Sequence, residues 1–155
     1  MKRLSITVAL FALALAACGG DEPGAAPTTP PPSGGTKPDV TVPAGPPPTS
    51  LVIEDVTQGN GAEAKDGATV TVHYVGVSYS TGKQFDASWD RGEPFSFQLP
   101  GNVITGWNEG VPGMKVGGRR KLIIPPDKAY GPEGRPPTIK PNETLIFVID
   151  LIEVA

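Results

Sequence analysis

The chain has 155 residues and a formal charge of −3, which suits one small globular domain and an additional segment. This acidic balance excludes the broad basic face that nucleic-acid binding requires. One cysteine and one histidine exclude an internal disulfide and supply too few soft ligands for a zinc site, so we expect neither a metal nor another cofactor.

The first 17 residues have the pattern of a lipoprotein signal peptide. A basic start precedes an apolar run, Leu4–Ala17, which is shorter than the roughly 20 residues needed to span a bilayer. The run ends in a Leu-Ala-Ala-Cys sequence at Cys18 that resembles a bacterial lipobox, whose cysteine carries the acyl chains. An ordinary cleaved signal is the alternative, but it leaves an unpaired cysteine unexplained. We therefore predict lipidation of Cys18 and an exported protein, held at the cell-envelope membrane only by this lipid.

Residues 18–50 have the composition of a tether. They are rich in proline and glycine and contain no aromatic residue, so they have little to bury against the entropy lost on ordering a chain. We predict a disordered tether over 18–50 and a folded domain over 51–155. A long tether and an acidic surface favour a monomer.

Five runs in the folded region have the alternating apolar pattern or the β-branched composition of strands. A Ser-Thr-Gly-Lys sequence at 80–83 predicts a hairpin turn after the second of them. The five predicted strands are 51–57, 68–79, 94–99, 119–125 and 143–154.

One segment departs from the strand pattern. Ile104, Trp107 and Val111 are spaced i, i+3 and i+7, which predicts a helix of about two turns that ends near residues 110–113. Its glycines weaken it, so packing must hold it. The sequence thus predicts an α+β fold, an antiparallel sheet of five strands whose apolar face is covered by one short helix.

The chemistry-bearing residues include no histidine-dependent triad. His73 lies next to Tyr74 in a predicted strand, so it faces away from the apolar side and serves as a surface or packing residue. Asp86 and Arg91 fall within a stretch rich in aromatic residues, where a charge is costly unless it has a partner. From these residues alone, an aromatic core with a solvated Asp86 and a ring-lined pocket with a functional Asp86 both remain open.

A longer pattern favours the pocket. The segments 72–76 (VHYVG), 82–97 (GKQFDASWDRGEPFSF), 103–131 (VITGWNEGVPGMKVGGRRKLIIPPDKAYG) and 141–154 (PNETLIFVIDLIEV) together resemble the FKBP family of peptidyl-prolyl cis-trans isomerases. The resemblance implies a half-barrel sheet wrapped around one short helix. It also implies proline-containing polypeptides as substrates and macrolide immunosuppressants as further ligands.

The resemblance further implies roles for individual residues. It assigns catalysis to Asp86, Tyr130 and the backbone of Ile104, with Asp86 held by Arg91 and the Tyr74 hydroxyl. The implied substrate-binding residues are Tyr74, Phe85, Arg91, Phe95, Val103, Trp107, Ile139 and Phe147.

Arg135 and Thr138 depart from the family pattern at the pocket rim, and one residue is missing between Phe97 and Val103. The leading hypothesis is an isomerase that binds the twisted Xaa-Pro amide and accelerates the folding of exported proteins. The alternative is a membrane-anchored binding module or chaperone, which grips proline segments or hydrophobic ligands without catalysis.

Overall fold

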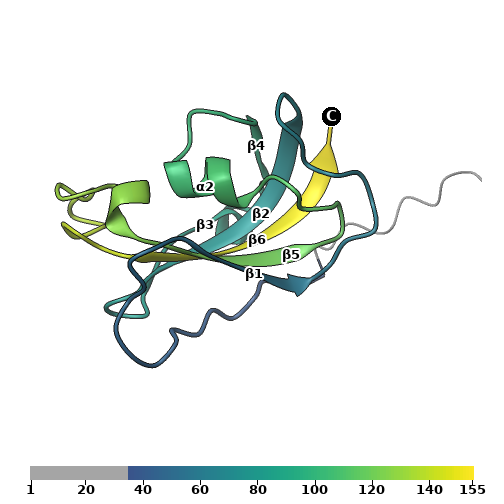
Figure 1. Cartoon of the computed structure of the whole chain (residues 1–155). Helices are drawn as coiled ribbons and strands as arrows, with labels where there is room; N and C mark the ends of the chain where they lie inside the picture. Colours follow the sequence, from purple (N-terminus) through teal and green to yellow (C-terminus); the bar gives the residue numbers. More distant parts are fainter. Residues whose placement is uncertain (1–34) are drawn as a thin grey trace, which may run out of the picture.

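A computed structural model describes residues 35–155. Its centre is one antiparallel sheet in the order β1-β5-β6-β2-β3, with β4 also paired to β2. Figure 1 shows this sheet curving beneath the helix α2, Thr105–Gly110. The strands are β1 Val52–Thr57, β2 Thr69–Ser78, β3 Gln84–Ala87, β4 Phe95–Gln98, β5 Arg119–Ile124 and β6 Leu145–Val154.

All five predicted strands are present, but the sheet has six strands, and the unpredicted one is β3. Its four residues include no β-branched side chain, and Asp86 and Ala87 are of types that are depleted in strands. The ten-residue strand β2 accommodates two short partners along one edge, because β4 pairs with residues 69–72 and β3 with residues 75–77. Two further short elements were also not predicted, α1 (Ser88–Arg91) and a 3-10 turn (Pro126–Lys128).

The predicted inner face of the sheet is confirmed. Alternate residues of β2, β5 and β6 are buried in one cluster together with Trp107 and Val111, which belong to α2 and its C-cap. The strand residues of this inner core are Val70, Val72, Tyr74, Leu122, Ile124, Leu145, Phe147, Ile149 and Leu151.

Two glycines of α2 allow the helix to lie directly on β5. A Cβ atom on Gly106 would stand 2.4 Å from Cγ2 of Ile124, and one on Gly110 would stand 2.7 Å from Cδ1 of Leu122. The glycines that weaken this helix locally are therefore the residues that let it pack. The close approach fixes the height of Trp107 above the sheet.

This contact leads to our first prediction. Gly106→Ala should lower the free energy of unfolding by about 1–3 kcal/mol through overpacking against Ile124, although alanine is the better helix former. Thr105→Ala, at an exposed position of the same helix, is the matched control and should have little effect. Denaturant unfolding of both variants measures the difference, and a Gly106→Ala protein as stable as the parent would contradict this packing.

The outer face of the sheet carries a second apolar cluster that includes Val75, Val77 and Ile146. Val40 and Val42 pack against it from the N-terminal side of the chain. We call residues 36–49 the strap. Figure 1 shows it, in dark blue, running along the side of the sheet opposite α2.

Polar contacts attach the strap at both of its ends. The Tyr79 hydroxyl lies 3.3–3.4 Å from the carbonyl oxygens of Pro43, Gly45 and Pro46. Arg119 Nη2 donates to the Thr36 carbonyl at 3.0 Å. Lys37 pairs with Asp90 at 2.5 Å and holds the pKa of that carboxylate below its ordinary value.

The prediction of a disordered tether up to residue 50 does not hold for the strap, and the folded unit begins before residue 51. The physical reason is that the outer sheet face is itself apolar, and the two strap valines cover it. Cys18, the predicted signal peptide and the first part of the predicted tether lie outside the described residues. Within residues 35–155, no helix is both long and apolar enough to cross a membrane.

Candidate active site

A cavity of about 240 Å³ opens on the inner side of the sheet, between α2, β2 and β3 and the loops beside them. Nine of the predicted site residues line it, together with two residues that were not predicted as site residues. The lining consists of Tyr74, Phe85, Asp86, Phe95, Asn102, Val103, Ile104, Trp107, Tyr130, Arg135 and Phe147.

Trp107 forms the floor of the cavity and is only 4% exposed. Its ring meets Tyr74 and Phe147 edge-on, with centroid separations of 5.2 and 5.3 Å. Such perpendicular contacts are a preferred aromatic geometry. They hold the indole rigidly, so the cavity has a floor of fixed shape.

Gly76 of β2 makes room for the wall of the cavity. A Cβ atom there would lie 2.7 Å from Cζ of Phe85 and 2.8 Å from Cε1 of Phe147. Without that atom the two rings approach to a centroid distance of 5.5 Å at nearly right angles. Gly76 is the direct cross-strand partner of Asp86 in the β2–β3 register. The glycine beside this carboxylate therefore allows the two rings to form the aromatic wall.

Asp86 has the two partners that the family resemblance implied. Its carboxylate accepts hydrogen bonds from the Tyr74 hydroxyl and from Arg91, both at 2.5 Å. Arg91 also donates to the Tyr74 hydroxyl at 3.0 Å. The Asp86 side chain remains 41% exposed, so its partners and residual water together offset the cost of placing a charge beside rings.

The contacts with Asp86 shift the pKa values of Tyr74 and Arg91. Burial, followed by the hydrogen bond to Asp86, raises the pKa of Tyr74. Hydrogen bonds to Tyr74 and Asp86 raise the pKa of Arg91. At neutral pH the phenol therefore stays protonated and donates its hydrogen bond to the Asp86 side chain.

Ile104 and Tyr130 bring hydrogen-bond donors to the cavity. Ile104 is the N-cap of α2, and its carbonyl accepts from Trp107 N–H at 2.9 Å. Within residues 35–155 neither the Ile104 backbone N–H nor the Tyr130 hydroxyl has a hydrogen-bond partner. Both donors are thus available to a carbonyl oxygen of a bound peptide.

Two predicted substrate-binding residues do not line the cavity. Arg91 acts through Asp86 and Tyr74, with its guanidinium 5.8 Å from the centre of the Tyr74 ring. Ile139 is 3% exposed within the inner core, where it supports the loop that carries Arg135. The family resemblance therefore identified two residues that support the cavity as well as those that line it.

Asn102 lines the cavity but was not among the predicted site residues. The only signal for it in the sequence was its position next to Val103. Arg135 was noted at the rim but not assigned a role. His73 lies on the outer side as expected, stacked on Trp89 at 4.3 Å and 2.9 Å from the Ser88 hydroxyl through Nδ1.

The fold and cavity define a class of protein, an antiparallel sheet wrapped over a short helix with a pocket lined by aromatic rings. A sequence model described as "FKBP-type peptidyl-prolyl cis-trans isomerase" matches residues 61–152. The chain belongs to this family.

Individual relatives agree with the family match. The chain is 57% identical over 116 residues to a probable FK506-binding protein of Corynebacterium glutamicum, covering 75% of this chain and 97% of the relative. It is 58% identical over 120 residues to the FK506-binding protein of Streptomyces anulatus, covering 76% and 97%.

Among solved structures, the crystal structure of FkpA from Escherichia coli superposes with a TM-score of 0.61 at 48% identity, over 67% of this chain and 47% of that one. AtFKBP13 superposes with a TM-score of 0.64 at 39% identity, over 70% of this chain and 96% of that one.

The length of the first match bears on the strap. A match that covers 75% of a 155-residue chain, 116 residues, has to begin at or before residue 40. It therefore includes Val40 and Val42. This similarity agrees with a folded unit that starts ahead of residue 51.

Proposed function

We propose that this chain catalyses the cis-trans isomerisation of Xaa-Pro bonds in polypeptides. The observation that carries the proposal is the ring-lined cavity with Trp107 as its floor and two unused donors beside it. The floor and walls accept an apolar proline ring. The donors of Ile104 and Tyr130 bind carbonyl groups on either side of it.

The reaction needs no covalent bond to the protein. Rotation about an amide is slow because it breaks the amide resonance, with a barrier of about 18–20 kcal/mol. A catalyst that binds the twisted amide better than either planar form lowers this barrier. A cavity that removes the amide from water acts in this direction, because the planar form is the more polar and loses more hydration.

Asp86 supplies a fixed charge to this site. Held by Arg91 and Tyr74, its carboxylate favours the altered polarisation of the twisted amide without rearranging during the reaction. Tyr74 connects the two parts of the site, because its hydroxyl donates to Asp86 and its ring packs on Trp107.

Asp86→Leu should lower kcat/KM for a short Xaa-Pro peptide about tenfold, which corresponds to roughly 1.4 kcal/mol. The matched control is Asp90→Leu, which removes an exposed carboxylate that pairs with Lys37 outside the cavity. Asp90→Leu should leave kcat/KM unchanged. An unchanged kcat/KM in a folded Asp86→Leu protein would rule out the electrostatic role.

The proposed activity is tested with the full chain and a short Leu-Pro peptide whose isomerisation is followed directly. We expect acceleration that FK506 inhibits, since relatives of this chain are named for binding that compound. Saturable peptide binding without acceleration would instead identify a non-catalytic binding module.

We further propose that the protein acts outside the cytoplasm and assists the folding of exported proteins, where proline isomerisation limits folding rates. The support is the sequence of the first 18 residues, an apolar run ending at a single cysteine. Mass spectrometry of membrane-extracted protein should find acyl chains on Cys18. Cys18→Ala should abolish the modification, and an unmodified cysteine in the native protein would refute the anchor.

A further inference from the structure

Arg135 reaches the rim of the cavity from a loop whose base is pinned. Its backbone N–H donates to the Ile139 carbonyl at 2.8 Å, and the Ile139 N–H donates back at 2.9 Å. Because Ile139 is buried in the inner core, this reciprocal pair fixes the loop to the domain. The backbone of Arg135, from which the side chain extends, is therefore held in place by the fold.

The guanidinium group is also oriented. It lies 5.9 Å from the centre of the Tyr130 ring, in the arrangement of a cation–π contact. Stacking on a ring leaves the edge of the guanidinium, with its fork of N–H donors, free to bind a carboxylate. Tyr130 is itself a lining residue, so this edge is held at the cavity mouth.

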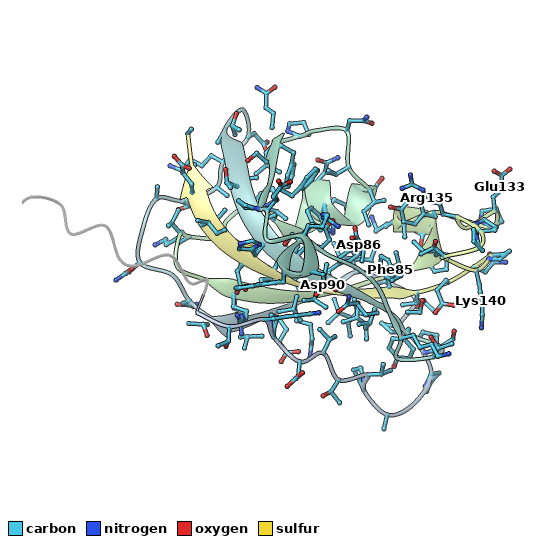
Figure 2. All side chains as sticks on the ribbon, turned by 180° about the vertical axis from the view of Figure 1, so that it is seen from behind. Phe85, Asp86, Asp90, Glu133, Arg135 and Lys140 are labelled. Carbon is cyan, nitrogen blue, oxygen red and sulfur yellow. The ribbon has the colours of Figure 1, made fainter. Side chains whose placement is uncertain are left out.

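The charge of Arg135 has no counterpart within residues 35–155. Six ion pairs are formed there, and none includes Arg135. The other charged lining residue, Asp86, is already paired with Arg91. Figure 2 shows the remaining charges of the loop pointing elsewhere, with Glu133 at its outer tip and Lys140 on the other side.

We propose that Arg135 is a specificity-determining residue that selects Xaa-Pro segments with a carboxylate side chain next to the proline. This inference rests on the proposed isomerase function. With the proline ring on Trp107, the flanking side chains extend to the rim of the cavity, where a carboxylate meets the only uncompensated charge of the described lining. A neutral flanking side chain gains nothing from this contact, and a cationic one is repelled.

The test compares kcat/KM of the full chain on matched peptides with Glu, Gln or Lys directly before the proline, and on a second set with these residues directly after it. The native protein should favour Glu over Gln on one side of the proline by about two- to fivefold, the range of an exposed ion pair. Lys should be the poorest of the three. Raising the salt to about 1 M should shrink the preference, because exposed charges are then screened.

Variants assign the preference to this side chain. The Glu-to-Gln ratio should fall to about one in Arg135→Gln, invert towards Lys in Arg135→Glu and be partly kept in Arg135→Lys. Lys140→Gln is the matched control, because it removes a positive charge from the same loop outside the cavity, and its ratio should equal that of the native protein. Thermal melts establish that each variant is folded.

The outcomes separate the two proposals. Turnover of a Leu-Pro peptide with equal kcat/KM for Glu and Gln on both sides would overturn the role of Arg135 and leave the isomerase intact. A Glu preference that survives in Arg135→Gln would likewise overturn it. Absence of turnover on every peptide would refute the proposed isomerase function itself.

Discussion

Arg119→Leu is expected to lower the free energy of unfolding by about 3–5 kcal/mol at neutral pH, the usual cost of leaving a buried charge without its partner. Asp150 is 0% exposed, and Arg119 binds its two carboxylate oxygens at 2.5 and 2.9 Å. Leucine in place of the arginine leaves this carboxylate in the sheet with no cation bonded to it. Denaturant unfolding of the variant measures the loss.

The pH dependence of this loss has a definite sign. Burial raises the pKa of Asp150, against the opposing influence of Arg119 and His73. A carboxylate whose folded pKa lies above its unfolded value contributes stability that is full below the unfolded pKa and is lost as the pH rises through the folded one. Removing Arg119 raises the folded pKa further, so the deficit of the variant should be small in acid and grow towards neutral pH.

A double variant separates this pair from a general effect of altering the strand. In Arg119→Leu/Asp150→Leu both charges are absent, and apolar replacement of a buried pair is often neutral or stabilising. The double variant should therefore recover most of the lost stability. A single variant as stable as the native protein, or a deficit that shrinks as the pH rises, would contradict this account.

A protein that begins at residue 51 is expected to melt roughly 10 °C lower than one that begins at residue 35. Two half-buried valines, Val40 and Val42, leave the outer face, which corresponds to about 1–3 kcal/mol. For a domain of this size each kcal/mol shifts the melting temperature by about 4–8 °C. The Tyr79 hydroxyl also loses its carbonyl acceptors.

The same truncation should leave kcat/KM nearly unchanged below the melting temperature, because the cavity lies on the inner side of the sheet and no strap residue lines it. Val42→Asp should reproduce much of the destabilisation in the longer protein. Thr41→Asp, at the adjacent exposed position, is its control. Equal melting temperatures for the long and short proteins would show that the strap does not stabilise the fold.

The candidate site was largely predictable because the family resemblance covers the few continuous segments in which its residues lie. Phe85 and Asp86 are adjacent, Val103 and Ile104 are adjacent, and Trp107 follows within one helical turn. The role of Gly76 was not predictable, because it depends on two rings that occupy the space where a side chain would lie. The lack of an ion-pair partner for Arg135 within residues 35–155 was not predictable either, because it depends on which carboxylates the tertiary structure brings close.

The sequence by itself determined the inner face of the sheet, the short helix and the set of rings that meets there. The inner face and the helix follow from periodicity, which each segment expresses through its own backbone geometry. The assignment of the rings to one pocket followed from the family resemblance. Only the tertiary structure showed that the strap covers the outer face of the sheet. There Arg119 donates a hydrogen bond to the carbonyl of Thr36, which lies 83 positions away in the chain. Such contacts depend on how strands are registered and which apolar surface remains uncovered, and no local pattern in a proline-rich segment carries that information.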